Sequence, residues 1–423
     1  MTADQWVHRV QTRTVAVLSA AQVLSGVAVA GSVAAGSLLA ASVSGSEGMA
    51  GLAQTAGVVG AALLALPLAR IALVRGRRAA LSTGYGIGAV GALVVIVAAV
   101  ARSTPLVLLG CLLVGVASAA GYQARYAATD LANQDTRGRS LSLVVWAGTI
   151  GAILGPNLLQ VAGSWGMALS LPQLAGPYVV AFGALATAAV VLVVLLRPDP
   201  YLVARRRQAQ TDPPPDPGAA APRLSDGLAH LRVNRGAQLG MLTIALGHMV
   251  MVMVMVMTPI HMAHVDVTLQ LIGLVISVHV AGMYAFSPVV GWAVDRWGRI
   301  PVIWTGVGIL ALSCVLAGLA PGDDIPLLGI GLFLLGLGWS CTLIAGSTVL
   351  VDDVTPDERP SVQGLSDLVM NVAGALGGAL AGVVVLVSSY GVLCAVAIVP
   401  VVLLAALTRR WGHEAEPRRV PAA

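Results

Sequence analysis

The sequence predicts an all-α polytopic membrane protein, with twelve transmembrane helices in two pseudo-symmetric six-helix bundles. Three observations predict it. Of the 423 residues, 57% are hydrophobic and 10% are charged, whereas an ordinary soluble domain has about 25% charged residues. Apolar runs of about 20 residues, the length that crosses a bilayer, recur along the whole chain. A long polar interruption divides these runs into six and six.

The apolar runs give the predicted spans in order. The first run follows Arg9 and Arg13, but it is longer than the apolar part of a signal peptide, so we expect it to remain as a helix. The twelve spans are expected at 14–41, 49–72, 79–101, 105–129, 140–163, 174–196, 238–263, 268–292, 301–320, 326–350, 362–385 and 388–408.

The basic residues predict the orientation. All 24 are arginines, and with the N-terminus inside, only Arg102 falls in an outer loop. The positive-inside rule therefore predicts a multi-pass protein of a bacterial-type inner (cell) membrane with both termini in the cytoplasm. Because topology explains the net charge of +5, no nucleic-acid partner is predicted. The expected partners are the lipid bilayer and a small ion or small-molecule substrate, and we expect the protein to function as a monomer.

The chain order predicts two domains and a linker. An N-terminal six-helix bundle covers 1–196, a cytoplasmic linker covers 197–237, a C-terminal six-helix bundle covers 238–408, and a cytoplasmic tail covers 409–423. The linker is rich in proline, alanine and arginine, a composition typical of a flexible connection. A shift of 222 residues superimposes Gly76-Arg77 on Gly298-Arg299 and Arg137 on Arg359. Internal repeats of this kind are typical of secondary transporters, whose binding site lies near the bilayer midplane.

The segment from Gly291 to Arg299, GWAVDRWGR, carries a family resemblance. It resembles the loop between the second and third helices of each half in the major facilitator superfamily. The resemblance implies a charge lock at the cytoplasmic end, and so a gate role for Asp295, Arg296, Gly298 and Arg299. The N-terminal copy keeps Gly76 and Arg77 but departs from the pattern, with Leu73 where the aspartate would stand.

A methionine ladder, 251-MVMVMVM-257, occupies the seventh span. In lipid this run must be helical, because an open strand would leave backbone groups without partners. At about 100° per residue, Met251 and Met255 share a side with His248, and the other methionines of the ladder lie opposite. A histidine is costly against lipid and normally faces the interior. The inward face therefore selects Met251 and Met255, with His248 either an interior histidine whose hydrogen bonds are satisfied or an accessory ligand.

The eighth span adds His279 and Met283, one turn apart on one face. Since the two spans are antiparallel and joined by a short loop, Met255 matches His279 in depth and Met251 matches Met283. Thioether and imidazole groups suit monovalent copper. The sequence therefore predicts a midplane site of Met251, Met255, His279 and Met283 for copper(I) as substrate, with no permanently bound cofactor.

The same four residues carry a closer resemblance. Met251-x-x-x-Met255 and His279-x-x-x-Met283 are similar to the paired MxxxM and HxxxM signature of the CcoA-like copper importers, a branch of the same superfamily. This implies alternating-access import of copper. The alternative is a proton-coupled exporter of apolar drugs or small metabolites, in which the methionines form an adaptable apolar wall. No ATP-binding motif is found, so we predict a secondary transporter with no catalytic residues rather than an enzyme.

Arg125 and a second polar pair are the other candidates. Arg125 lies in the fourth span with Asp130 about one turn on, so it either pairs with Asp130, faces the central passage as an accessory gate residue, or extends to the inner surface. Asp367 and Asn371 lie one turn apart in the eleventh span. Further candidates to line the passage are Gln22, Gln123, Asn157 and Gln160.

Overall fold

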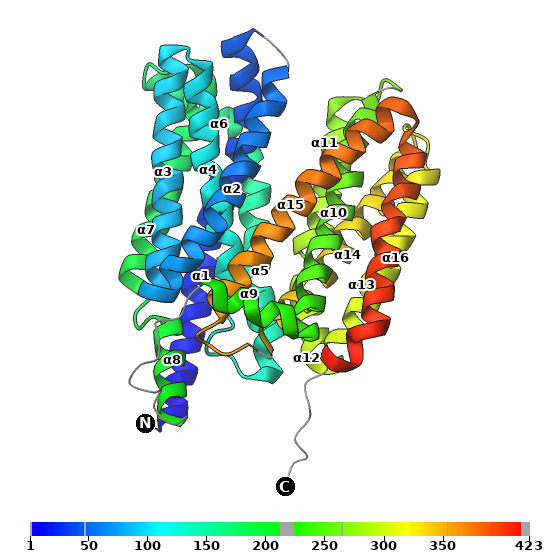
Figure 1. Ribbon diagram of the computed structural model, residues 1–423. Coiled ribbons are helices and arrows are strands. Elements are labelled where there is room, and N and C mark those ends of the chain that lie inside the picture. Colours follow the sequence, from blue (N-terminus) through cyan, green and yellow to red (C-terminus); the bar gives the residue numbers. More distant parts are fainter. Residues whose placement is uncertain (1, 46–47, 212–223, 264, 353, 416–423) are drawn as a thin grey trace. The chain divides into compact units, whose positions relative to one another are not determined.

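The computed structural model describes residues 2–45, 48–211, 224–263, 265–352 and 354–415, and the regular structure in them is helical (Figure 1). Within these residues, twelve segments are long and apolar enough to cross a membrane. The predicted number of spans is confirmed.

The chain forms two compact units, and unit 1 comprises residues 1–132, 147–227 and 356–368. It contains the second part of α5 and the first part of α15, whose full bounds are Arg137–Asn157 and Arg359–Val387. Its other helices are α1 (Ala3–Ser44), α2 (Gly48–Arg75), α3 (Arg77–Ala101), α4 (Thr104–Ala127), α6 (Leu159–Ala168), α7 (Gly176–Leu195) and α8 (Pro200–Thr211), with a short 3-10 turn at Gln173–Ala175.

Unit 2 comprises residues 133–146, 228–355 and 369–423, and so holds the remaining parts of α5 and α15. Unit 1 thus takes most of the first half of the sequence and unit 2 most of the second, while residues 133–146 and 356–368 belong to the unit of the other half. The helices of unit 2 are α9 (Leu224–Val233, of which all but the first turn belongs here), α10 (Arg235–Ala263), α11 (Leu269–Tyr284), α12 (Ser287–Trp297), α13 (Arg299–Leu319), α14 (Ile325–Asp352) and α16 (Tyr390–Ala415), with a 3-10 turn at Gln134–Thr136.

The linker differs from the flexible connection expected from its composition. Helices α8 and α9 occupy both of its ends, while residues 212–223 lie outside the described residues, as do residues 416–423 of the tail. In α8, Tyr201 is buried and Arg205 pairs with Asp357 at 2.6 Å. Side-chain contacts with the rest of unit 1 hold this helix in place.

One helix forms the centre of each unit. In unit 1, α4 packs against α1, α2 and α3, and in unit 2, α14 packs against α10, α11 and α13. The 222-residue shift relates α4 to α14, so the repeat predicted from sequence is also a repeat of packing.

Glycines allow the close packing of α5 on α1. A Cβ atom on Gly26 would lie 2.9 Å from the Cα of Gly151, and one on Gly31 would lie 3.3 Å from the carbonyl oxygen of Gly155. Such distances are typical of membrane helices that meet through small residues. The glycines of the fifth span are packing contacts within unit 1.

Candidate functional site

The turns at Gly76 and Gly298 mark the same end of the repeated helices, here called the basic end. In unit 2, Arg299 Nε lies 2.8 Å from Asp352 Oδ2, and Arg137 Nη1 lies 2.6 Å from Asp352 Oδ1. In unit 1, Arg77 Nε lies 2.8 Å from Asp130 Oδ2. The 222-residue shift relates Arg77 to Arg299 and Asp130 to Asp352. Both units therefore contain the same buried ion pair, although only one copy of the loop has its aspartate.

Asp295 binds a helix N-terminus. Its two carboxylate oxygens accept hydrogen bonds from the backbone N–H groups of Gly138 and Arg139, each at 2.8 Å, in the first turn of α5. These N–H groups have no partner within the helix, and the helix dipole favours an anion there. Gly298 adopts a φ of 99° and Arg296 is exposed. The gate role of the four residues stays a prediction.

In unit 1 a carboxylate of the linker caps other helix starts. Asp199 Oδ2 accepts from the N–H of Arg78 at 2.8 Å, and Oδ1 accepts from the N–H groups of Tyr201 and Leu202 at 3.1 and 3.2 Å. One carboxylate thus caps the N-termini of both α3 and α8. No spacing in the sequence pairs position 199 with position 78, so this contact was not predicted.

Arg125 lies in the last turn of α4 and is buried. Its Nη2 donates to Asp367 Oδ1 at 2.8 Å and to Tyr126 Oη at 3.2 Å. The rings of Tyr126 and Tyr122 lie 4.7 and 5.6 Å from the guanidinium carbon. Of the pairings considered from sequence, Arg125 with Asp130 is wrong, because Asp130 is bound by Arg77. Arg125 and Asp367, two polar residues singled out separately, instead form one buried pair in unit 1.

The glutamine and asparagine candidates have different surroundings. Gln22 is half-buried and its Oε1 accepts from Tyr85 Oη at 3.4 Å, while Gln123 is buried and donates to the carbonyl of Ala65 at 3.0 Å. Asn157 and Gln160 are exposed. Gln123 therefore ties α4 to α2, and the other three stay candidates.

The predicted methionine–histidine site lies in unit 2. Met251, His279 and Met283 are buried, with exposed fractions of 4%, 0% and 7%, and Met255 is half-buried. Helices α10 and α11 each pack mainly on α14 and less on each other. The convergence of the four side chains stays a prediction. Met249 and Met253 lie elsewhere, since a Cβ atom on Gly377 of α15 would be 3.1 Å from the Cγ of each.

His279 has an arrangement typical of a ligand. Its Nδ1 donates to the carbonyl of Leu332 at 2.8 Å, which leaves Nε2 as the unprotonated nitrogen of the neutral ring. Within the described residues, Nε2 is buried and has no hydrogen-bond partner. In the same residues, no three His, Cys, Asp or Glu side chains gather in a way that could hold a metal ion. A metal site here would therefore depend on methionine sulfur.

A second polar cluster, the mid-span cluster, consists of His248 on α10, Tyr284 on α11 and Trp339 on α14. Trp339 Nε1 donates to His248 Nδ1 at 3.1 Å. The ring of Tyr284 stands edge-on to Trp339, with 5.6 Å between centroids. On α15, a Cβ atom at Gly374 would lie 2.8 Å from His248 Nε2. Sequence reasoning found His248 and missed the other two; the position of Trp339 halfway along a span was the available signal.

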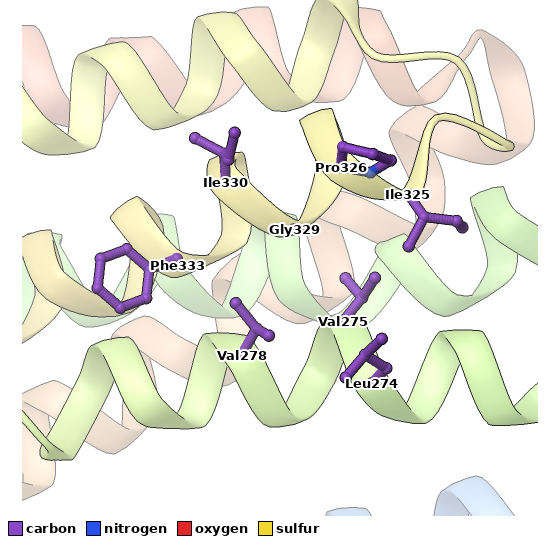
Figure 2. A pocket seen from close by; sticks show the side chains of 8 residues that line it. All are labelled: Leu274, Val275, Val278, Ile325, Pro326, Gly329, Ile330 and Phe333. Atoms are coloured by element: carbon purple, nitrogen blue, oxygen red, sulfur yellow. The ribbon is translucent and has the colours of Figure 1, made fainter.

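An apolar pocket of about 380 Å³ lies between α11 and α14 (Figure 2). Figure 2 shows Leu274, Val275 and Val278 of α11 on one side and Ile325 and Phe333 of α14 on the other, and Ile330 of α14 adds to the lining. Leu274 and Ile330 are more than half exposed, so the pocket opens at the surface of unit 2. Since its lining has no polar side chain, it offers nothing to orient a polar solute.

Comparison with known proteins decides the family. The model of the Major Facilitator Superfamily matches residues 18–266 and 240–423. The chain belongs to this superfamily. It is a multi-pass membrane protein with the fold of the secondary transporters of that group, as twelve apolar spans and the repeat already indicate.

Two relatives and one solved structure illustrate the range of the superfamily. The uncharacterized MFS-type transporter YdeG of Bacillus subtilis is 39% identical over 378 residues, covering 89% of this chain and 87% of YdeG. The riboflavin transporter RfnT of Brucella anthropi is 27% identical over 360 residues, covering 85% of each chain. The crystal structure of the human organic anion transporter MFSD10 matches with a TM-score of 0.70 at 17% identity, covering 94% of this chain and 99% of that one, which shows the fold alone.

Proposed function

We propose that this member of the Major Facilitator Superfamily is a proton-coupled secondary transporter of a small organic solute, and that Arg125 and Asp367 form its coupling element. The observation that carries the proposal is the buried ion pair between them, at 2.8 Å and with side chains 3% and 1% exposed. We further propose that the basic end faces the cytoplasm of a bacterial-type inner membrane, because the arginines gather there.

The pair has the properties of a two-state switch. In a low-dielectric interior the attraction between the two charges is strong, and an unpaired buried charge is costly. A proton on Asp367 would remove the attraction and free Arg125, whereas a proton leaving Asp367 would restore it. Ionisable residues inside membrane spans mark proton and substrate pathways in transporters. A solute that binds one state better than the other would then be coupled to proton movement.

Riboflavin is the natural first solute to test, because RfnT, a riboflavin transporter by name, aligns over most of this chain. The two tyrosine rings beside Arg125 also place aromatic surface next to the ion pair, and aromatic faces bind planar organic groups.

Reconstituted protein in liposomes tests the proposal. We expect an inward proton gradient to drive riboflavin accumulation in the unaltered protein. Asp367→Asn should abolish gradient-driven accumulation and keep riboflavin exchange at equal pH. Asp357→Asn is the matched control in the same unit, because the Asp357 side chain is 43% exposed and lies in a surface pair with Arg205. Accumulation that persists unchanged after the gradient is collapsed would contradict proton coupling.

Copper(I) is the second candidate solute, and the surroundings of His279 favour it. Metal-binding histidines usually donate their other ring N–H to a carbonyl or carboxylate, as His279 does to Leu332. Met283, buried one turn on, would supply a soft sulfur ligand.

Copper uptake separates the two candidates. If copper(I) is the solute, radiocopper uptake into vesicles should fall at least about tenfold in both His279→Ala and Met251→Ala. Met249→Ala serves as the control, because Met249 packs against Gly377. Equal uptake by all three variants and the unaltered protein would rule copper out.

A further inference from the structure

We infer that unit 1 carries a binding site for an anionic phospholipid, phosphatidylglycerol. The site is a pocket of about 460 Å³ between the last two turns of α1, the end of α3 and the 3-10 turn at Gln173–Ala175. All three segments belong to unit 1. The inference concerns the lipid around the protein, so it does not depend on the solute or on the coupling element proposed above.

The pocket lies at the end of unit 1 opposite the basic end. Helix α3 begins at the basic end with Arg77 and finishes directly before the pocket residue Arg102. The apolar pocket residues of α1 and α3 lie in the last two turns of their membrane spans, Asp4–Ser44 and Arg77–Ala101. The ends of apolar spans lie where the hydrocarbon core meets the headgroup region. A phospholipid in this pocket would therefore have its phosphate level with Arg102 and an acyl chain along the spans.

The lining of the pocket is amphipathic. Its apolar part comprises Leu39, Val43, Val100 and Leu174. Its polar part comprises Ser42, Arg102 and Gln173. Leu39 is buried, whereas Arg102 and Gln173 are exposed, so the pocket opens at the surface of unit 1. A molecule with an apolar chain and a polar head matches both parts, whereas a free inorganic ion matches the polar part alone.

Arg102 is an unusual residue at its position for two reasons. In the orientation predicted from sequence it is the arginine placed in an outer loop, against the positive-inside rule. It also adopts a φ of 50° at the end of α3, where glycine is the usual residue because a side chain is strained there. Of the residues that the structure describes, no carboxylate lies within ion-pair distance of its guanidinium. An external anion accounts for an arginine that topology and backbone geometry both disfavour.

The chemistry of the pocket selects a phosphodiester with a net negative charge. A guanidinium presents two parallel N–H donors that match the oxygen atoms of a phosphate. The amide of Gln173 adds a donor and an acceptor for a glycerol headgroup. Among the described residues no acidic side chain lines the pocket, so the ammonium group of phosphatidylethanolamine would have no partner there. Phosphatidylglycerol supplies the phosphate, the hydroxyl groups and the acyl chains without that cation.

Lipid binding to the purified full-length protein in detergent tests the site. The probes are phosphatidylglycerol and phosphatidylethanolamine with the same acyl chains, and soluble glycerol 3-phosphate, with native mass spectrometry to measure the fraction bound. One basic residue near the membrane surface strengthens the binding of anionic lipid by about fivefold. We expect phosphatidylglycerol to bind with a Kd about fivefold lower than phosphatidylethanolamine, and glycerol 3-phosphate not to bind.

The charge is tested at Arg102. Arg102→Gly suits the backbone conformation of this position, so the variant should fold at least as stably as the unaltered protein. It should raise the Kd for phosphatidylglycerol by about fivefold, while Arg102→Lys should keep most of the affinity. Arg206→Gln is the matched control for the lost charge, because Arg206 is exposed on α8 and does not line the pocket. Its Kd should stay unchanged.

The apolar part is tested with two valines of α3. Val100 and Val97 are both 59% exposed, but only Val100 lines the pocket. Val100→Phe should weaken the binding of phosphatidylglycerol by about fourfold for each methylene group of the acyl chain that it displaces. Val97→Phe should leave the Kd unchanged.

Four results would each overturn the inference. Equal Kd values for the two lipids would show that the pocket does not select an anionic lipid, and equal effects of Arg102→Gly and Arg206→Gln would reduce the preference to overall charge. Equal Kd values for Val100→Phe and Val97→Phe would place the lipid elsewhere. Binding of glycerol 3-phosphate would assign the pocket to a soluble phosphate instead of a lipid.

Discussion

The basic ends of the two units share one arginine–aspartate pair and differ in the carboxylates that cap their helices. In both, an arginine that starts a helix, Arg77 or Arg299, is neutralised by an aspartate at the end of the neighbouring central helix. The helix caps differ: Asp295 of the signature loop caps the start of α5 in unit 2, whereas Asp199 of the linker caps the starts of α3 and α8 in unit 1. The ion pair is therefore the repeated element, whereas the capping carboxylates come from different segments and serve different helices.

The largest expected difference from this comparison concerns the paired aspartates. Asp130 pairs with one arginine, Arg77, which also donates a hydrogen bond to Gln363. Asp352 instead pairs with two arginines, Arg137 and Arg299. Removing one member of a buried pair costs about 3–5 kcal/mol. Asp130→Ala should lower thermal stability by this amount, and Asp352→Ala by more, because it leaves two arginines unpaired. Equal melting temperatures of the two variants would show that the second arginine contributes nothing.

The next effect concerns the two glycine turns. Gly76 and Gly298 adopt φ values of 88° and 99°. A residue with a side chain is destabilised by about 1–3 kcal/mol in this backbone conformation. A Cβ atom at Gly76 would also clash with Asp199 Oδ2, whereas at Gly298 it would meet only Pro301 Cδ, at an ordinary contact distance of 3.8 Å. Gly76→Ala should therefore lower the melting temperature more than Gly298→Ala. A larger decrease in melting temperature for Gly298→Ala would show that the Asp199 side chain moves away from residue 76 without a loss of stability.

A smaller effect is expected from the two caps. Loss of a helix cap costs about 1 kcal/mol. Asp199→Ala removes caps from two helices and should destabilise the protein about twice as much as Asp295→Ala, which affects one. Asp199→Asn keeps the acceptor oxygen and should recover most of the loss. If Asp199→Ala has no effect on thermal unfolding, the caps on α3 and α8 contribute nothing to stability.

The smallest effect is expected at the surface of unit 1. The Arg205 and Asp357 side chains are 40% and 43% exposed at 2.6 Å. Exposed pairs of this kind contribute about 0.2–1 kcal/mol. Arg205→Gln should thus change the melting temperature little, and the change should shrink further at high salt. A loss as large as that of Asp130→Ala would mean that α8 is held mainly by this pair.

The sequence predicted what depends on composition and period. Span number, the repeat and the signature loop follow from apolar length and from Gly76, Arg77, Gly298 and Arg299, and the fold agrees with them. The sequence did not predict side-chain partners that lie far apart along the chain. The one partner considered for Arg125 was nearby Asp130, but its partner Asp367 lies 242 positions away, and only the fold of unit 1 brings the two side chains together.

Side-chain direction was the other limit. Helical periodicity put His248, Met251 and Met255 on one face, yet it could not tell which neighbouring helix that face meets. The structure turns His248 toward Trp339 and Gly374 and packs both α10 and α11 on α14. The spacing of residues within α10 and α11 could not predict that both helices pack on α14, because α14 begins about sixty residues after the end of α10.

The isolation of Trp339 has an optical consequence. Its indole is enclosed and hydrogen-bonded at mid-membrane depth, while most of the other tryptophans are exposed. A chain in which the other seven are replaced by phenylalanine would emit from Trp339 alone, at short wavelength while the indole stays dry. Entry of water or solute beside it would shift that emission to the red, so the wavelength of one residue would report when the interior of unit 2 opens.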